Sequence, residues 1–257
     1  MVIKSLIKTS LRRLNLQLSR VDAVQPPIHP EFPPDFSAAE IQMIQTARPY
    51  TMTSLERMYA LIQAVKYISQ HQIEGEIVEC GVWRGGSMML IANTLSAMQD
   101  QTRNLYLFDT FSGMAKPSDK DVSYEGLSAL EIFTENHGND SGSAWCYASL
   151  EEVKQILSQT HYDQQKIHFV PGKVEETIPQ QAPEKIALLR LDTDWYESTR
   201  HELIHLFPRL STHGVIIIDD YGFWQGARLA VDEYLEQNNL KILLNRIDDT
   251  GRIAVKL

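Results

Sequence analysis

The chain has 257 residues, a length that fits one α/β domain with an extension or at most two small domains. Its residues are 43% hydrophobic and 22% charged, a composition typical of a soluble globular protein. Its formal net charge of −9 argues against a nucleic-acid-binding surface, which needs a basic face. The two cysteines, Cys80 and Cys146, are too few for a disulfide framework and lack metal-ligand spacing, so we expect reduced thiols in a cytoplasmic protein.

The N-terminal segment differs in charge from the rest of the chain. Residues 1–20 hold five of the 24 Lys and Arg residues and no acidic residue, although the chain has 33 Asp and Glu. Apolar side chains recur there at helical spacing, at Ile3, Leu6, Ile7, Leu11, Leu14 and Leu18. The pattern predicts an amphipathic helical arm that packs against another subunit of a homo-oligomer or over the active-site cleft. A basic amphipathic helix can also lie on an anionic membrane. However, the chain has neither a membrane-spanning apolar run nor a signal-peptide cleavage site, so we do not expect a membrane protein.

A proline-rich stretch follows the arm. Five prolines lie between residues 26 and 34, in "QPPIHPEFPPDF", and predict an irregular connector. We therefore expect an arm with its connector over residues 1–37 and a single domain over residues 38–257.

Strands and helices alternate through the predicted domain. A possible capping box, Thr53 to Glu56, begins a helix with one apolar face formed by Leu55, Met58, Tyr59, Ile62, Val65 and Ile68. Strands are predicted over 76–80, 104–109, 166–172, 185–192 and 214–220. Helices are predicted between them, over 87–98, 151–158, 198–210 and 226–237. This alternation predicts a parallel sheet covered by helices on both faces.

The last two strands are predicted to be antiparallel. "LKILLNRI" and "RIAVKL" flank Asp248-Asp249-Thr250-Gly251, which is typical of a hairpin turn. Five parallel strands closed by a hairpin resemble the Rossmann-like, seven-stranded sheet of class I methyltransferases. Residues 113–150 show little periodicity, so we expect an insertion over the cleft.

The carboxyl ends of the strands carry most of the chemistry-bearing residues. Ligands bind at these ends in α/β sheets. Glu79 and Gly81 follow the first strand, and Gly85-Gly86 precede a helix, but the spacing is not that of a dinucleotide fingerprint. An acid before a glycine turn suits a cationic ligand, and Asp109 can accept both ribose hydroxyls of a nucleoside. Together these residues resemble an S-adenosylmethionine site.

A second group of acids follows the next two strands. Asp192 and the pair Asp219-Asp220 end strands that should be neighbours, and Asp194 lies just beyond. Converging carboxylates repel one another unless a cation lies among them, and all-oxygen ligands favour Mg²⁺. Asp194 is then placed as a general base. The alternative is that some of these acids only cap the following helices.

The stretch "HELIH", residues 201–205, matches the H-E-x-x-H pattern of zinc proteases. On a helix over 198–210, the residues Leu203, Ile204, Phe207 and Leu210 would form the buried face. His201 and His205 would then point to solvent, away from the strand ends. We therefore interpret the pattern as a helix surface and not as a zinc site.

Several separated segments resemble the macrocin O-methyltransferase family, and they occur in the expected order. They are "RPYTMTSLERM", "VECGVWRGGS", "FDTFSGM" and "LLRLDTDWYESTRHELIHLFPRLSTHGVIIIDDYGFWQGARLAVDEYL". The resemblance covers residues 48 to 257. It implies a Mg²⁺-dependent enzyme that uses S-adenosylmethionine to methylate a hydroxyl of a sugar or polyhydroxylated natural product.

The resemblance also implies roles for individual residues. The expected cofactor contacts are Thr51, Met52, Ser54, Arg57, Glu79, Gly81 and Asp109. The expected metal ligands are Asp192, Asp219 and Asp220, and the expected base is Asp194. Two positions depart from the family pattern: Thr193 stands where a small residue is usual, and Trp195 replaces a smaller or aliphatic side chain. Two other functions remain open at this stage, a metal-dependent hydrolase and a non-catalytic cofactor-binding protein.

Overall fold

The computed structural model describes residues 32–139 and 142–257 of the chain, and Ala38–Leu257 form one compact unit. The helix predicted within residues 1–20 lies outside the described residues, as does most of the proline-rich connector. Within the described part of the chain, every helix is too short or too polar to span a bilayer.

The seven strands form one sheet, and their bounds agree closely with most of the predicted ranges. They are β1 (Glu76–Cys80), β2 (Leu105–Asp109), β3 (Ile167–Pro171), β4 (Ile186–Leu191), β5 (Leu210–Ile218), β6 (Asn245–Arg246) and β7 (Arg252–Val255). Their order is β3-β2-β1-β4-β5-β7-β6. The first five are parallel, whereas β7 is antiparallel to both β5 and β6. The predicted mostly parallel sheet with a C-terminal hairpin is confirmed.

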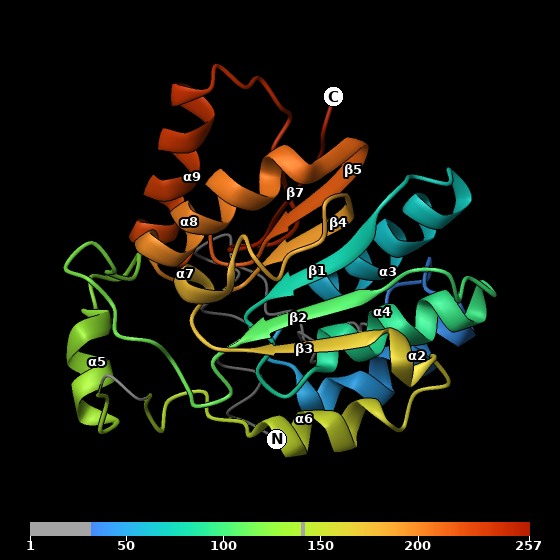
Figure 1. The fold of residues 1–257 in the computed structure, drawn as a ribbon, viewed down its shortest axis with the longest axis horizontal. Helices are drawn as coiled ribbons and strands as arrows, with labels where there is room; N and C mark the ends of the chain where they lie inside the picture. The colour runs from blue at the N-terminus through green and yellow to red at the C-terminus, as the bar shows by residue number, and fades with distance from the viewer. Residues whose placement is uncertain (1–31, 140–141) are drawn as a thin grey trace, which may run out of the picture. The chain divides into compact units, whose positions relative to one another are not determined.

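Helices cover both faces of this sheet (Figure 1). The α-helices are α2 (Ala38–Ala47), α3 (Leu55–Gln70), α4 (Gly86–Ala97), α5 (Ala129–Glu135), α6 (Leu150–Leu157), α7 (Val174–Thr177), α8 (Tyr196–Leu206) and α9 (Gln225–Gln237). Short 3₁₀ turns are η1 (Arg48–Tyr50), η2 (Gln164–Lys166) and η3 (Phe207–Arg209). The helices α2, α3, α4 and α6 lie on one face, and α7, α8 and α9 on the other. The arrowheads of β1 and β2 point toward the insertion that carries α5 (Figure 1).

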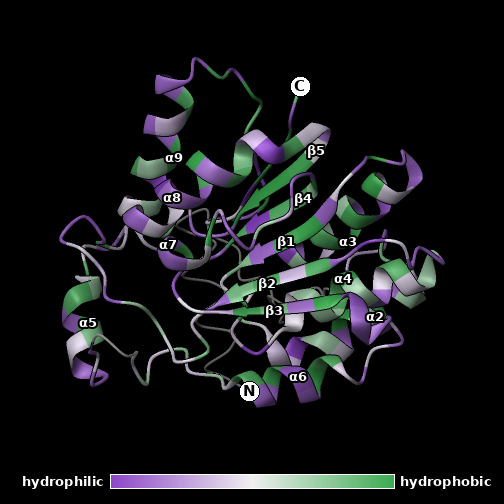
Figure 2. Ribbon diagram, in the orientation of Figure 1, coloured by the Kyte–Doolittle hydropathy of each residue, from purple (hydrophilic) through white to green (hydrophobic). Residues whose placement is uncertain are grey.

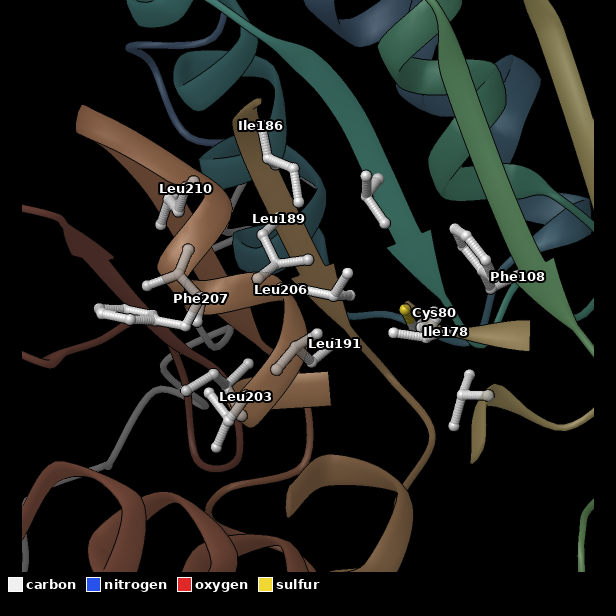
Figure 3. Close-up of a cluster of buried hydrophobic side chains, with 14 of the residues drawn as sticks. Cys80, Phe108, Ile178, Ile186, Leu189, Leu191, Leu203, Leu206, Phe207 and Leu210 are labelled. Carbon is white, nitrogen blue, oxygen red and sulfur yellow. The ribbon is translucent and has the colours of Figure 1, made fainter. Parts of the chain in front are cut away.

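One hydrophobic core lies between the sheet and α8 and α9. Alternate residues of β4 point to this face, where Leu189 and Leu191 meet Leu203 and Leu206 of α8 (Figure 3). All four are almost completely buried. The strands are mostly hydrophobic, with hydrophilic residues at the carboxyl ends of β1 and β2, while the helices carry both hydrophilic and hydrophobic residues (Figure 2).

Two predicted helix boundaries are wrong for identifiable reasons. The helix predicted over 198–210 ends at Leu206, because the Phe207–Arg209 turn contains Pro208 and β5 already begins at Leu210. The N-cap of α3 is Ser54, whose Oγ accepts from the Arg57 N–H at 3.1 Å. Thr53 does not cap this helix, because its backbone N–H and its hydroxyl both contact the Thr51 hydroxyl.

The first strand of the C-terminal hairpin is also shorter than predicted. Only Asn245–Arg246 of the stretch 240–247 pair with β7, which is itself four residues long. The preceding Leu243 is 82% exposed. A long apolar strand at a sheet edge would offer unpaired backbone groups to other chains, so a short edge strand is the safer arrangement.

Candidate active site

The strand ends bring the predicted acids to one edge of the sheet. β1 lies between β2 and β4, and β5 is the next neighbour of β4. Glu79 and Asp109 therefore end adjacent strands, as do Asp192 and Asp219. The prediction that β4 and β5 are neighbours is confirmed, and the two acidic groups meet around the end of β4.

The turn after β1 can contain only glycine at Gly81. This residue has φ +83°, which L side chains rarely adopt. A Cβ there would lie 2.0 Å from the backbone oxygen of Asp192. Since Gly81 also lines the main pocket at this edge, its missing side chain leaves space for both β4 and a ligand.

Asp109 closes the same turn from β2. Its Oδ2 accepts from the backbone N–H groups of Val82 at 2.6 Å and Trp83 at 3.0 Å, and its Oδ1 accepts from Phe111 at 2.7 Å. Burial raises the pKa of Asp109, although these hydrogen bonds act in the opposite direction. The carboxylate lines the pocket, so it lies where the sequence predicts a ribose-binding acid.

Glu79 is fully buried and is paired with an arginine that the sequence analysis does not identify. Its Oε1 accepts from Arg190 Nη1 at 2.7 Å, and its Oε2 has no hydrogen-bond partner within the described structure. Burial raises the pKa of Glu79 to about 7 despite Arg190. The only sequence signal for Arg190 is a single charge inside the apolar run "KIALLRLD".

Arg190 joins the two acidic groups. Its Nη1 donates to Asp192 Oδ2 at 2.6 Å as well as to Glu79, and its Nη2 donates to Asp219 Oδ1 at 2.5 Å. The guanidinium is 3% exposed, so three carboxylates share one buried cation. A planar guanidinium with several fixed donors is suited to this contact, whereas a lysine ammonium is not.

Three acids form a compact group of carboxylate oxygens. One oxygen each of Asp192, Asp194 and Asp220 lies within 4.8 Å of the others, the one potential metal-ligand group among the described residues. Burial raises the pKa of all three carboxyls, that of Asp194 to about 7. Asp220 Oδ2 is buried without a hydrogen-bond partner. The oxygen donors, their spacing and this unpartnered oxygen fit a hard divalent cation.

Asp219 does not belong to this group. One of its carboxylate oxygens accepts from Arg190 and the other from Arg57 Nη1. Of the three predicted metal ligands, the structure thus brings together Asp192 and Asp220 but not Asp219. The third member of the group is Asp194, the predicted base.

The predicted cofactor contacts before α3 divide into two sets. Met52 is 63% exposed and lines the pocket, and Thr51 lies beside it, packed against Gly86 at the start of α4. Ser54 and Arg57 do not line the pocket. Both donate to Asp248 Oδ2 in the β6–β7 turn, at 2.5 and 2.9 Å.

One wall of the pocket comes from the insertion and from aromatic residues after β4 and β5. The rings of Trp195 and Trp224 lie 5.1 Å apart, and Trp145 of the insertion lies 5.4 Å from Trp195. The Trp195 indole N–H donates to the Ala115 carbonyl at 2.9 Å. Met114, Ala115, Cys146 and Trp195 line the pocket together with Asp192 and Asp194. The sequence predicts an insertion over the cleft. It does not predict the contacts of the insertion with Trp195 and Trp224, because no local pattern indicates them.

The HELIH segment lies in α8, and its buried face differs from the predicted one. Ile204 is 39% exposed, whereas Glu202 is 0% exposed. His201 Nε2 lies 2.9 Å from the Ile178 carbonyl, and both histidines are partly exposed. The inner side of α8 is centred nearer to Glu202 and Leu206 than the wheel indicated, because Leu210 belongs to β5 and does not define a helix face.

Comparisons with known proteins agree with this geometry. Residues 43–255 match the family model described as macrocin O-methyltransferase (TylF). The chain is 31% identical over 205 residues to demethyldecarbamoylnovobiocin O-methyltransferase of Streptomyces niveus, covering 80% of this chain and 75% of that protein. It is 30% identical over 202 residues to mycinamicin III 3''-O-methyltransferase of Micromonospora griseorubida, covering 79% and 76%.

Solved structures show the same fold. The O-methyltransferase NovP superposes with a TM-score of 0.69 at 28% identity, covering 80% of this chain and 82% of that one. The calicheamicin methyltransferase CalS11 has a TM-score of 0.58 at 18% identity, covering 88% and 94%, and supports the fold alone. The family model spans most of the chain, and methyl transfer is favoured over the hydrolase alternative. The chain therefore belongs to the macrocin O-methyltransferase family and is an O-methyltransferase.

Proposed function

We propose that the chain transfers the methyl group of S-adenosylmethionine to a hydroxyl of a glycosylated or polyhydroxylated small molecule, with Mg²⁺ at the acidic group. One observation carries this proposal: a single pocket is lined by residues of both predicted sites. Gly81 and Asp109 come from the predicted cofactor site, and Asp192 and Asp194 from the predicted metal site. A nucleoside at the first pair and an acceptor hydroxyl at the second would share one cavity. We propose that residues 38–257 form the methyltransferase domain and that residues 1–37 form the arm with its connector.

The names of the relatives support the proposed class of acceptor. Those named above act, by their names, on a novobiocin precursor and on mycinamicin III, and a third, 30–31% identical like them, methylates a rhamnosyl-tetracenomycin. Trp195 lines the pocket and is held by ring contacts with Trp145 and Trp224, and this aromatic surface supports an acceptor with an apolar part beside its hydroxyls.

The residues at the first end of the pocket would hold the cofactor. Glu79, buried and with one unpartnered oxygen, is suited to the ammonium group of the methionine moiety. Asp109 is suited to the ribose hydroxyls, and Gly81 permits close approach of the backbone. Met52, which lines the pocket and is largely exposed, would contact the bound cofactor on its solvent side.

The residues at the second end would bind a divalent ion and activate the acceptor. We propose Asp192 and Asp220 as ligands, with Asp219 or Asp194 as the third. A divalent ion bound there supplies charge that orients the acceptor oxygen and lowers the pKa of its hydroxyl. Asp194 accepts the proton of that hydroxyl as the oxygen attacks the methyl carbon and the bond from that carbon to sulfur breaks. Burial raises the pKa of Asp194 to about 7 in the metal-free chain, and a divalent ion beside it would lower this pKa, so that the carboxylate form is present to accept a proton.

The test is a methyl-transfer assay with labelled S-adenosylmethionine against a panel of glycosides. We expect Asp192→Ala to abolish turnover while calorimetry still detects S-adenosylhomocysteine binding, and we expect EDTA to abolish turnover of the wild type. Full activity of the variant, or of the wild type in EDTA, would contradict the metal-dependent mechanism. Mg²⁺ affinities of Asp219→Asn and Asp194→Asn then identify the third ligand, because only loss of a ligand weakens binding strongly.

A further inference from the structure

Glu202 of the HELIH segment is a buried carboxyl that the proposed mechanism does not use. It is 0% exposed, and its Oε1 accepts from the Thr193 hydroxyl at 2.8 Å. Its Oε2 has no hydrogen-bond partner in the described structure, and burial raises the pKa of the carboxyl well above its ordinary value. Burying such a group is costly, and an apolar side chain would fill the same place beside Leu203 and Leu206 without that cost. The contact with Thr193 is therefore the feature that needs an explanation.

Thr193 stands between two of the grouped acids, Asp192 and Asp194. The backbone of Asp192 is held by its N–H, which donates to the Cys80 carbonyl at 2.8 Å. The Thr193 carbonyl accepts from the Trp195 N–H at 2.8 Å. With the hydroxyl bound to Glu202, Thr193 is thus anchored at both its backbone and its side chain.

The residue after Thr193 has an unusual backbone conformation. Asp194 has φ +70°, a left-handed conformation that costs free energy in residues other than glycine. Such a conformation persists only where neighbouring contacts hold it. This conformation accompanies the placement of the Asp194 carboxylate beside Asp192 and Asp220.

We propose that Glu202 is a positioning residue, which acts through the Thr193 hydroxyl to hold Asp194 in the left-handed conformation that completes the acidic group. The inference rests on the proposed function, in which this group binds Mg²⁺ and Asp194 is the base.

The first test measures Mg²⁺ affinity by calorimetry in the presence of S-adenosylhomocysteine. Thr193→Val keeps the size of the side chain but removes the hydroxyl, and Glu202→Met removes the acceptor. We expect each to weaken Mg²⁺ binding roughly tenfold, as loss of groups that orient metal ligands does. The double variant should be no weaker than either single variant, because both break the same contact. Thr193→Ser and the exposed control Glu197→Gln, on the same helix, should stay within about twofold of the wild type.

Either of two results would overturn the inference: wild-type Mg²⁺ affinity in Thr193→Val, or additive losses in the double variant. A second test needs no metal. In a crystal structure of metal-free Thr193→Val, we expect Asp194 to leave the left-handed region, and an unchanged conformation would also overturn the inference. If the wild type itself does not bind Mg²⁺, the proposed function fails, but this second test still decides the role of Glu202.

Discussion

The buried acidic residues at the strand ends lower the stability of the folded chain at the place where the proposed function needs them. The carboxyls of Glu79, Asp192 and Asp219 share the single buried guanidinium of Arg190, while Asp194 and Asp220 have no arginine partner among the hydrogen bonds described. Gathering ionised carboxylates in one buried place costs free energy unless some of them are protonated or a cation binds among them. The stability of the metal-free chain should therefore depend on pH through these residues.

We predict that Asp194→Asn stabilises the metal-free chain, and increasingly so at higher pH. Burial raises the pKa of Asp194 from its ordinary value of 3.8 to about 7. The folded state thus favours the protonated acid, and this contribution to stability is lost as pH rises toward 7. Asparagine resembles the protonated acid, so its advantage should grow from about pH 4 to pH 7, toward an upper limit of roughly 4 kcal/mol.

Urea denaturation in EDTA between pH 5 and pH 8 measures this difference in the free energy of unfolding. Glu197→Gln, which changes an exposed carboxylate, is the control and should show little pH-dependent difference. A stabilisation by Asp194→Asn that shrinks with rising pH would show that Asp194 is ionised and satisfied without a metal. Added Mg²⁺ should remove the advantage of the variant.

Among the elements, the insertion over residues 113–150 is held to the sheet by a few specific contacts. Asp121 is 1% exposed, and its Oδ1 accepts from the Tyr196 N–H at 2.8 Å. The N-cap of α8, Trp195, makes no side-chain cap of its own, so a residue 75 positions earlier in the chain caps the helix. Oδ2 of Asp121 accepts from the backbone and hydroxyl of Ser118 at 2.7 and 2.8 Å. One carboxylate thus joins the insertion to the helix that follows Asp194.

We predict that Asp121→Ala loosens the insertion without weakening cofactor binding. Loss of a helix cap and of buried hydrogen bonds should lower the free energy of unfolding by roughly 1–2 kcal/mol. Proteolysis should then cut the insertion faster, and the KM for the acceptor should rise. Calorimetry with S-adenosylhomocysteine should give the wild-type affinity, because Asp121 does not line the pocket and makes no hydrogen bond to Gly81 or Asp109 among those described.

The control for this prediction is Asp119→Ala, an exposed acid two residues away. It should leave both proteolysis and stability unchanged. Equal proteolysis of Asp121→Ala and the wild type would mean that the tryptophan contacts alone hold the insertion.

The elements were predictable where the chain is regular, and the site was predictable where it depends on sheet topology. The strands β1 to β4 and the acids at their ends follow from short apolar runs, because parallel strands must end at one edge. The family resemblance added roles to those acids. Periodicity carries no information on long-range polar contacts, so Arg190, Asp121 and the Thr193–Glu202 pair were missed. The wheel for HELIH failed at Ile204 because the helix was assumed to continue through Leu210.

At the scale of the whole molecule, the C-terminal turn ties together segments that are far apart in the sequence. Asp248 lies 194 residues after Ser54, and its Oδ2 accepts hydrogen bonds from the Ser54 hydroxyl at 2.5 Å and from Arg57 Nε at 2.9 Å. Arg57 in turn donates to Asp219 at the end of β5. The start of α3, the hairpin and the acidic edge therefore form one connected polar network.

We predict that Asp248→Asn lowers the free energy of unfolding by about 2 kcal/mol at pH 7, because hydrogen bonds to a charged acceptor are stronger than those to an amide. Burial alone would raise the pKa of Asp248, but hydrogen bonds from Ser54 and Gly251 and the charge of Arg57 lower it. A lowered pKa contributes stability above the ordinary value, and this is lost as pH falls through the folded-state value. The difference between wild type and variant should therefore stay constant above about pH 4 and shrink below it, opposite in direction to Asp194. Asp249→Asn is the matched control. Asp249 is the next residue in the turn, its side chain is 97% exposed, and it pairs only with Arg246 among the ion pairs described. If both variants lose the same stability, the turn itself and not the link to α3 is what Asp248 stabilises.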